Sequence, residues 1–128
     1  MEVDFEFGST TWLGYHVCLG DLAPKVGAIV LCIDYRLAPE NRLPIAYQDG
    51  YSSLEWLVKN QNLDPWLAQA NLSRIFLSGD SAGGNIAHNV ANEIIRSNDD
   101  FVKEVKIRGL LLIHPFFNLV VKRGLPKK

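Results

Sequence analysis

Three short apolar runs, separated by segments of helical character, set the main limit on how this chain can fold. They cover residues 27–34, 74–79 and 107–113. Each run is nearly continuous rather than alternating, which is typical of strands covered on both faces of a parallel sheet. Strands that alternate with helices along a chain predict right-handed βαβ units. The predicted fold class is therefore α/β, with about three parallel strands flanked by helices.

Helical periodicity fills the segments around these runs. One helix is predicted after Pro44, because proline suits the first helical turn, and another is predicted directly after Ser81. An earlier helix is predicted to start near residues 9–11. The apolar stripes comprise Trp12, Tyr15, Leu19 and Leu22 in the earliest helix, Tyr47, Tyr51, Leu54 and Val58 in the next, and Ile86, Ala87, Val90, Ala91 and Ile94 in the last.

Composition limits the kind of partner. The chain has 128 residues, the length of one domain with a modest core, and a net charge of −1 from 13 basic and 14 acidic side chains. This balance produces no strong positive electrostatic potential that would attract nucleic acid or an anionic membrane, so a small, nearly neutral ligand is predicted. Cys18 and Cys32 lie in apolar sequence without a CxxC pattern. They are predicted to be buried, reduced thiols, and no metal or cofactor is expected.

The two ends of the chain have distinct character. Residues 1–4 are acidic and no apolar segment of signal-peptide or membrane-spanning length follows them, which predicts a cytoplasmic protein without membrane insertion. From about residue 119 the chain becomes basic, with four lysines or arginines in the last seven positions. This part is predicted to be a frayed tail on a single domain spanning residues 1–128.

A run of small residues carries the chemical signal. Gly79-Asp80-Ser81-Ala82-Gly83 satisfies G-x-S-x-G, with Gly84 after it, between a predicted strand and a predicted helix. In such a nucleophile elbow the serine hydroxyl projects above the carboxyl edge of the sheet, and the small neighbours let the strand and helix backbones pass closely. Ser81 is therefore the candidate nucleophile, and the Ala82 N–H is the candidate oxyanion donor. Asp80 is predicted to tie the elbow to a nearby loop.

The segment GDSAGGNIAHNVA occurs together with DYRLAPENRLPIAYQDGYSSLEWL and GSTTWLGYH. This combination resembles the plant carboxylesterases of the α/β-hydrolase superfamily, the group related to hormone-sensitive lipase, from about Phe5 to Phe117. The resemblance implies a partial α/β-hydrolase fold and cleavage of small carboxylic esters through an acyl-Ser81 intermediate. It also implies that Arg36 and Glu40 form a local scaffold and take no part in the chemistry.

Two departures from the family pattern lead to the expectation of a truncated, weakly active or inactive fragment. Family members carry His-Gly-Gly-Gly-Phe before the GSTTW segment, whereas residues 1–4 here read Met-Glu-Val-Asp, so half of the oxyanion hole is expected to be missing. The triad acid and base should follow the nucleophile at a distance that this chain does not reach. The strand before the missing glycines is also expected to be absent, which would open a gap of about 10 Å in the sheet.

The three histidines offer no clear replacement for the missing base. His16 and His88 are predicted to be surface or packing residues of helices. His114 is predicted to end a strand at the same sheet edge as Ser81, so it is a candidate substitute base, although no acid is evident to orient its ring.

Two other functions stay open on the same family pattern. The gibberellin receptors resemble this family and keep the serine elbow, but they bind a hormone without catalysis. A dehydratase acting on a flavonoid is the other alternative. The segment DYRLAPENRLPIAYQDGYSSLEWL looks closer to the esterases, which favours the hydrolase.

Overall fold

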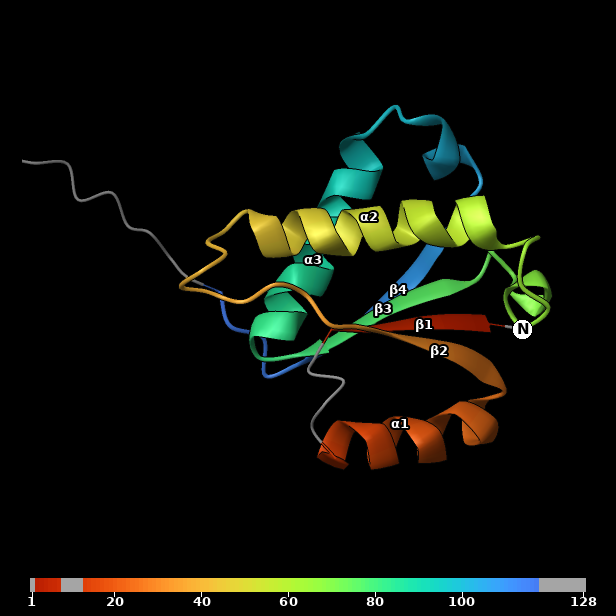
Figure 1. Cartoon of the computed structure of the whole chain (residues 1–128), viewed down its shortest axis with the longest axis horizontal. Coiled ribbons are helices and arrows are strands. Elements are labelled where there is room, and N and C mark those ends of the chain that lie inside the picture. Colours follow the sequence, from red (N-terminus) through yellow and green to blue (C-terminus); the bar gives the residue numbers. More distant parts are fainter. Residues whose placement is uncertain (1, 8–12, 118–128) are drawn as a thin grey trace, which may run out of the picture.

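A computed structural model describes residues 2–7 and 13–117 of the chain, and it contains one parallel sheet of four strands (Figure 1). The strands are β1 (Glu2–Phe7), β2 (Ala28–Ile33), β3 (Ile75–Asp80) and β4 (Ile107–Ile113), in the order β2-β1-β3-β4. The helices are α1 (Leu13–Val26), α2 (Ile45–Asn60) and α3 (Ala82–Arg96), with short 3-10 helices at Leu67–Gln69 and Asp100–Lys103. Figure 1 shows α1 on one face of the sheet and α2 and α3 on the other. This arrangement confirms the predicted α/β class.

The prediction of about three strands and a gap between two of them is wrong. Residues 2–7 form β1 between β2 and β3, and they include three of the four positions that were matched to the family's His-Gly-Gly-Gly. β1 pairs with both neighbours in parallel, with Val3 opposite Ile29 and Ile75. Because the backbone of β1 forms hydrogen bonds with both flanking strands, the sheet has no gap between β2 and β3.

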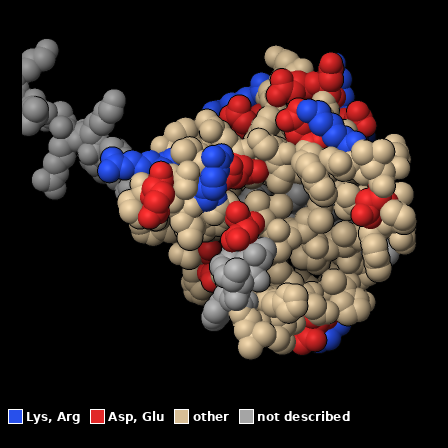
Figure 2. All heavy atoms as spheres, viewed as in Figure 1, with Lys and Arg blue, Asp and Glu red and all other residues tan. Residues whose placement is uncertain are grey.

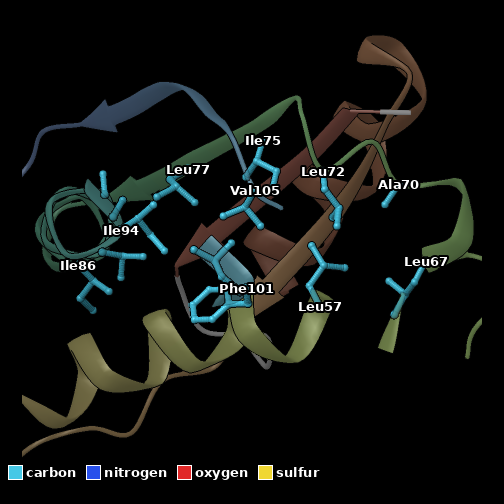
Figure 3. Close-up of a cluster of buried hydrophobic side chains, with 14 of the residues drawn as sticks. Leu57, Leu67, Ala70, Leu72, Ile75, Leu77, Ile86, Ile94, Phe101 and Val105 are labelled. Carbon is cyan, nitrogen blue, oxygen red and sulfur yellow. The ribbon is translucent and has the colours of Figure 1, made fainter. Parts of the chain in front are cut away.

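The core lies between the sheet and the helices α2 and α3. The predicted stripe of α3 is buried at every position, and Leu54 and Leu57 of α2 and Ile75 and Leu77 of β3 are fully buried. In Figure 3 the labelled side chains of Leu77 from β3 and of Ile86 and Ile94 from α3 belong to one buried cluster, and Phe101 lies between α2 and the sheet. These contacts fix the position of the β3–α3 junction, where the candidate nucleophile lies.

Helix α1 packs less closely than the sequence suggests. Tyr15, Leu19 and Leu22 are half-buried, as their shared stripe predicts, but no residue of α1 is fully buried. The prediction of two buried thiols is therefore wrong for Cys18, which is exposed, while Cys32 on β2 is half-buried; neither of these two described cysteines is in a disulfide. Trp12, the predicted helix start at residues 9–11 and the predicted tail lie outside the described residues.

The outer strands are also more open than expected. On β4, Leu111 is 56% exposed and Ile113 45% exposed, so the prediction that all strands are covered on both faces fails there. Near β2, uncharged side chains cover most of the surface between α2 and α1 (Figure 2). A groove of about 390 Å³ lies along that strand and includes Trp56 and Trp66 in its wall. No helix within the described ranges is both long and apolar enough to cross a bilayer.

Candidate active site

Ser81 occupies the junction between β3, which ends at Asp80, and α3, which begins at Ala82. Its backbone has φ 53° and ψ −111°, a conformation that residues other than glycine rarely adopt. The residue is exposed, and its side chain does not cap the helix that follows it. Ser81 therefore lies exposed at the carboxyl edge of the sheet, where the motif predicts it.

Two glycines make this sharp junction possible. A Cβ atom on Gly79 would overlap the carbonyl group of Gly83 and lie 2.6 Å from the amide nitrogen of Gly84. A Cβ atom on Gly84 would lie 3.0 Å from the carbonyl oxygen of Gly79 and 3.1 Å from Cβ of Pro115. Because the crowding atoms belong mainly to backbone, the strand and the helix touch directly at these positions, as the small residues of the motif predict.

Ala82 presents an N–H group beside Ser81. It is the first residue of α3, and within the described ranges its N–H donates to no acceptor. The first N–H groups of a helix lack partners inside the helix, and the helix dipole favours negative charge near them. An oxyanion that formed on an ester bound to Ser81 would meet this donor.

A cavity of about 400 Å³ adjoins Ala82. It lies between α2, the start of α3 and the loop that follows β2, and its wall includes Leu37, Leu43, Ile86 and Phe116. Most of its surface is apolar, so it suits an apolar group better than a charged one.

Hydrogen bonds connect the elbow region to two other helices. The Tyr15 hydroxyl donates to Oδ2 of Asp80 at 3.0 Å, so Asp80 ties the end of β3 to α1. The prediction that Asp80 ties the elbow to a loop is therefore wrong. The Tyr47 hydroxyl donates to Oδ1 of Asn85 at 2.6 Å and so connects α2 to the first turn of α3. Neither tyrosine was singled out as a partner from the sequence, because each bond joins residues distant along the chain.

The loop after β2 is held by an ion pair. The Arg36 guanidinium donates to both carboxylate oxygens of Asp49 on α2, with the shortest N–O distance 2.7 Å, and the Arg36 backbone N–H donates to the same carboxylate at 2.9 Å. The hydrogen bonds from Arg36 lower the pKa of Asp49 below its usual value. Arg36 is thus a scaffold residue, as the resemblance implied. Its partner is Asp49, and Glu40 makes no ion pair within the part of the chain that is described.

The histidines lie as follows. His16 is exposed on α1, and His88 is half-buried on α3, with its ring 5.1 Å from that of Phe117 in an edge-to-face arrangement. His114 is exposed and directly follows β4, so it lies at the same carboxyl edge of the sheet as Ser81. Within residues 13–117, neither the Ser81 hydroxyl nor the His114 ring takes part in a hydrogen bond. The same residues contain no group of three or more side chains suited to a metal ion.

Comparison with known proteins agrees with this geometry. A family profile for the alpha/beta hydrolase fold matches residues 5–127. The chain belongs to the alpha/beta hydrolase family. The family match extends from within β1 through the elbow and past β4, so it includes every residue named in this section.

Individual relatives of this alpha/beta hydrolase include enzymes and a receptor. Probable carboxylesterase 6 of Arabidopsis thaliana is 46% identical over 114 residues, covering 89% of this chain and 33% of the relative. Gibberellin receptor GID1C of the same plant is 45% identical over 105 residues, covering 80% of this chain and 28% of the receptor. The solved esterase of Pyrobaculum calidifontis is 30% identical with a TM-score of 0.73, over 90% of this chain and 36% of that one. The chain therefore spans about a third of the length of these proteins.

Proposed function

We propose that this chain carries the nucleophile elbow of a serine carboxylesterase that acts on small carboxylic esters. Ser81 is the proposed acyl acceptor, and the Ala82 N–H is the proposed oxyanion donor. Gly79, Asp80, Gly83 and Gly84 form the elbow that supports them. The observation that carries the proposal is the left-handed backbone of Ser81 at a strand–helix junction so tight that Gly79 has no room for a Cβ atom.

The proposed reaction begins when the Ser81 oxygen attacks the carbonyl carbon of the ester. The carbonyl oxygen becomes an oxyanion, which the Ala82 N–H stabilises, and the alcohol then leaves with a proton while the acyl group stays on Ser81. Water releases the acid in a second step. Ser81 needs a base that takes up its proton, and none of the described residues hydrogen-bonds to its hydroxyl. The rate at which Ser81 reacts therefore reports whether a base lies within reach.

A fluorophosphonate probe tests the role of Ser81 directly. The serine oxygen displaces fluoride from phosphorus, and intact-mass spectrometry measures the mass gained by the chain. We expect one adduct on the native chain, none on Ser81→Ala, and an unchanged adduct on Ser73→Ala, which removes an exposed serine from a turn before β3. An adduct that persists in Ser81→Ala would refute the assignment of the nucleophile.

A non-catalytic, hormone-binding protein of the gibberellin-receptor type is the second candidate. It is kept because GID1C is about as similar to this chain as the carboxylesterase is, at 45% against 46% identity. Calorimetric titration with a gibberellin, and ester hydrolysis measured on the same preparation, separate the two candidates. Binding without hydrolysis or labelling would favour the receptor, and labelling of Ser81 without binding would favour the esterase.

We also propose that the protein acts in the cytoplasm. Cys18 and Cys32, both within the described residues, form no disulfide, as expected in a reducing compartment. Imaging of a fluorescent fusion in plant cells tests this location, and a signal confined to plastids or to the secretory pathway would contradict it.

A further inference from the structure

We propose that the turn at residues 113–116, directly after β4, positions the nucleophile, and that His114 acts in this turn through its backbone and not through its imidazole ring. This inference rests on the proposed role of Ser81. It makes His114 a positioning residue, in contrast to the substitute base that the sequence left open.

Both backbone polar groups of Ser81 are hydrogen-bonded to this turn. The Ser81 N–H donates to the carbonyl oxygen of Ile113 at 2.9 Å, and the Phe116 N–H donates to the carbonyl oxygen of Ser81 at 3.0 Å. The competing bond inside α3, from the Asn85 N–H to the same oxygen, is longer, at 3.3 Å. The peptide groups on both sides of the Ser81 Cα are thus anchored to one short segment, which holds its φ angle in the left-handed region.

The turn can supply both anchors because its own backbone reverses at His114. His114 has φ 43°, and apart from Ser81 it is the one non-glycine residue with positive φ within the described ranges. Pro115 follows with a restricted φ and no N–H to satisfy, and its Cβ lies against Gly84 at the start of α3. The φ angle of His114 therefore determines whether the Phe116 N–H can reach the Ser81 carbonyl.

The surroundings of the His114 ring do not suit a general base. Such a histidine is normally oriented by a carboxylate or carbonyl group, as well as lying within reach of the nucleophile. The His114 residue is exposed, and no hydrogen bond holds its ring within residues 13–117. What the position does require is a residue that tolerates positive φ, and histidine, asparagine and glycine meet that requirement better than a β-branched residue.

Three substitutions at position 114 separate the backbone from the ring. His114→Asn and His114→Gly remove the imidazole but accept positive φ, whereas His114→Val removes it and disfavours that conformation. Asparagine and valine have similar size, so they form a matched pair. The first measurement is the rate of Ser81 labelling by the fluorophosphonate probe between pH 5 and pH 8.

We expect the Asn and Gly variants to label within about threefold of the native rate with the same pH profile, and the Val variant to label about tenfold more slowly, the effect of a strained backbone residue. If His114 acts as a base, all three variants lose the rate equally, together with any inflection near the usual histidine pKa of about 6.5. That result would overturn the inference.

A second measurement does not depend on reactivity. Amide hydrogen exchange, followed by NMR on the whole chain, reports the two hydrogen bonds through the N–H groups of Ser81 and Phe116, with the Leu77 N–H inside β3 as reference. We expect exchange at the first two to accelerate about tenfold in His114→Val relative to Leu77, and to stay near native in His114→Asn and His114→Gly. Unchanged exchange in the Val variant would refute the dependence of these two hydrogen bonds on the backbone of His114.

The two measurements also separate failure of this inference from failure of the proposed function. A native chain that is never labelled removes support for the esterase, while the exchange data still test the turn. If His114→Val fails to fold, the Asn and Gly variants distinguish the two roles of His114. Native-like exchange with retained labelling supports the positioning role. Native-like exchange with lost labelling assigns the imidazole ring a chemical role and overturns the inference.

Discussion

Replacing Gly79 by alanine is the sharpest test of the tight strand–helix junction. The new Cβ atom would overlap the Gly83 carbonyl group and lie 2.6 Å from the Gly84 nitrogen, all of them backbone atoms that cannot rotate away. To reach ordinary contact, β3 and α3 would have to separate by about 1 Å. Overpacking of a close-packed interior costs about 1–3 kcal/mol, and a backbone clash belongs at the upper end, so we expect about 3 kcal/mol less stability.

A graded series of glycine variants provides the controls. Gly84→Ala meets its nearest atom at 3.0 Å, so a loss of about 1 kcal/mol is expected, partly offset by the better helix propensity of alanine. Gly20→Ala on the exposed surface of α1 meets nothing within 4 Å and should stabilise the chain by about 0.5–1 kcal/mol.

Thermal unfolding followed by circular dichroism measures all three variants. For a chain of this size, about 3 kcal/mol corresponds to a fall in Tm of roughly 10 °C for Gly79→Ala. The labelling rate of Ser81 should fall in the same variant at a temperature where it is still folded. Equal Tm values for Gly79→Ala and Gly20→Ala would refute the direct contact between the two backbones.

Two further predictions concern the side chains that support the elbow. Hydrogen bonds from Arg36 lower the pKa of Asp49 in the folded state, so the ion pair stabilises the fold above pH 3.8 and this stability is lost as the pH falls through the lowered pKa. Asp49→Asn should flatten this part of a profile of Tm against pH. An unchanged slope would contradict the pairing. Tyr15→Phe removes the hydrogen bond to Asp80 and should cost about 1 kcal/mol in chemical denaturation, with faster amide exchange in α1; native stability would contradict the bond.

The sequence predicts most of the elements because local pattern and burial agree in them. The apolar stripe of α3 is buried at each predicted position, and the runs at 27–34, 74–79 and 107–113 become β2, β3 and β4. The elbow is predicted for a similar reason, since G-x-S-x-G between a strand and a helix leaves few alternatives for the backbone of Ser81.

Strand β1 is the main omission, and its signal was present. Val3, Phe5 and Phe7 alternate with acidic residues, a period of two that is typical of a strand. Alignment of residues 1–4 with the family His-Gly-Gly-Gly led to no strand being predicted there. Only the pairing of β1 with β2 and β3, which lie far away in the sequence, shows that the segment occupies the centre of the sheet.

The contacts around Ser81 also lie beyond a local pattern. The turn at residues 113–116 follows a different strand, and nothing in its sequence indicates that it bonds to the elbow. Similarly, Tyr15 and Asp49 become partners of Asp80 and Arg36 only when the helices pack on the sheet. The positive φ at His114 could not be predicted either, because histidine adopts positive φ much less readily than glycine does.

A crystal structure of the chain after reaction with the fluorophosphonate probe is the most direct measurement of the proposed site. We expect phosphorus bonded to Oγ of Ser81, with one phosphoryl oxygen about 2.7–3.1 Å from the Ala82 nitrogen. Phosphorus on any other residue, or a phosphoryl group on Ser81 whose oxygens all point away from Ala82, would contradict the assignment of nucleophile and oxyanion donor.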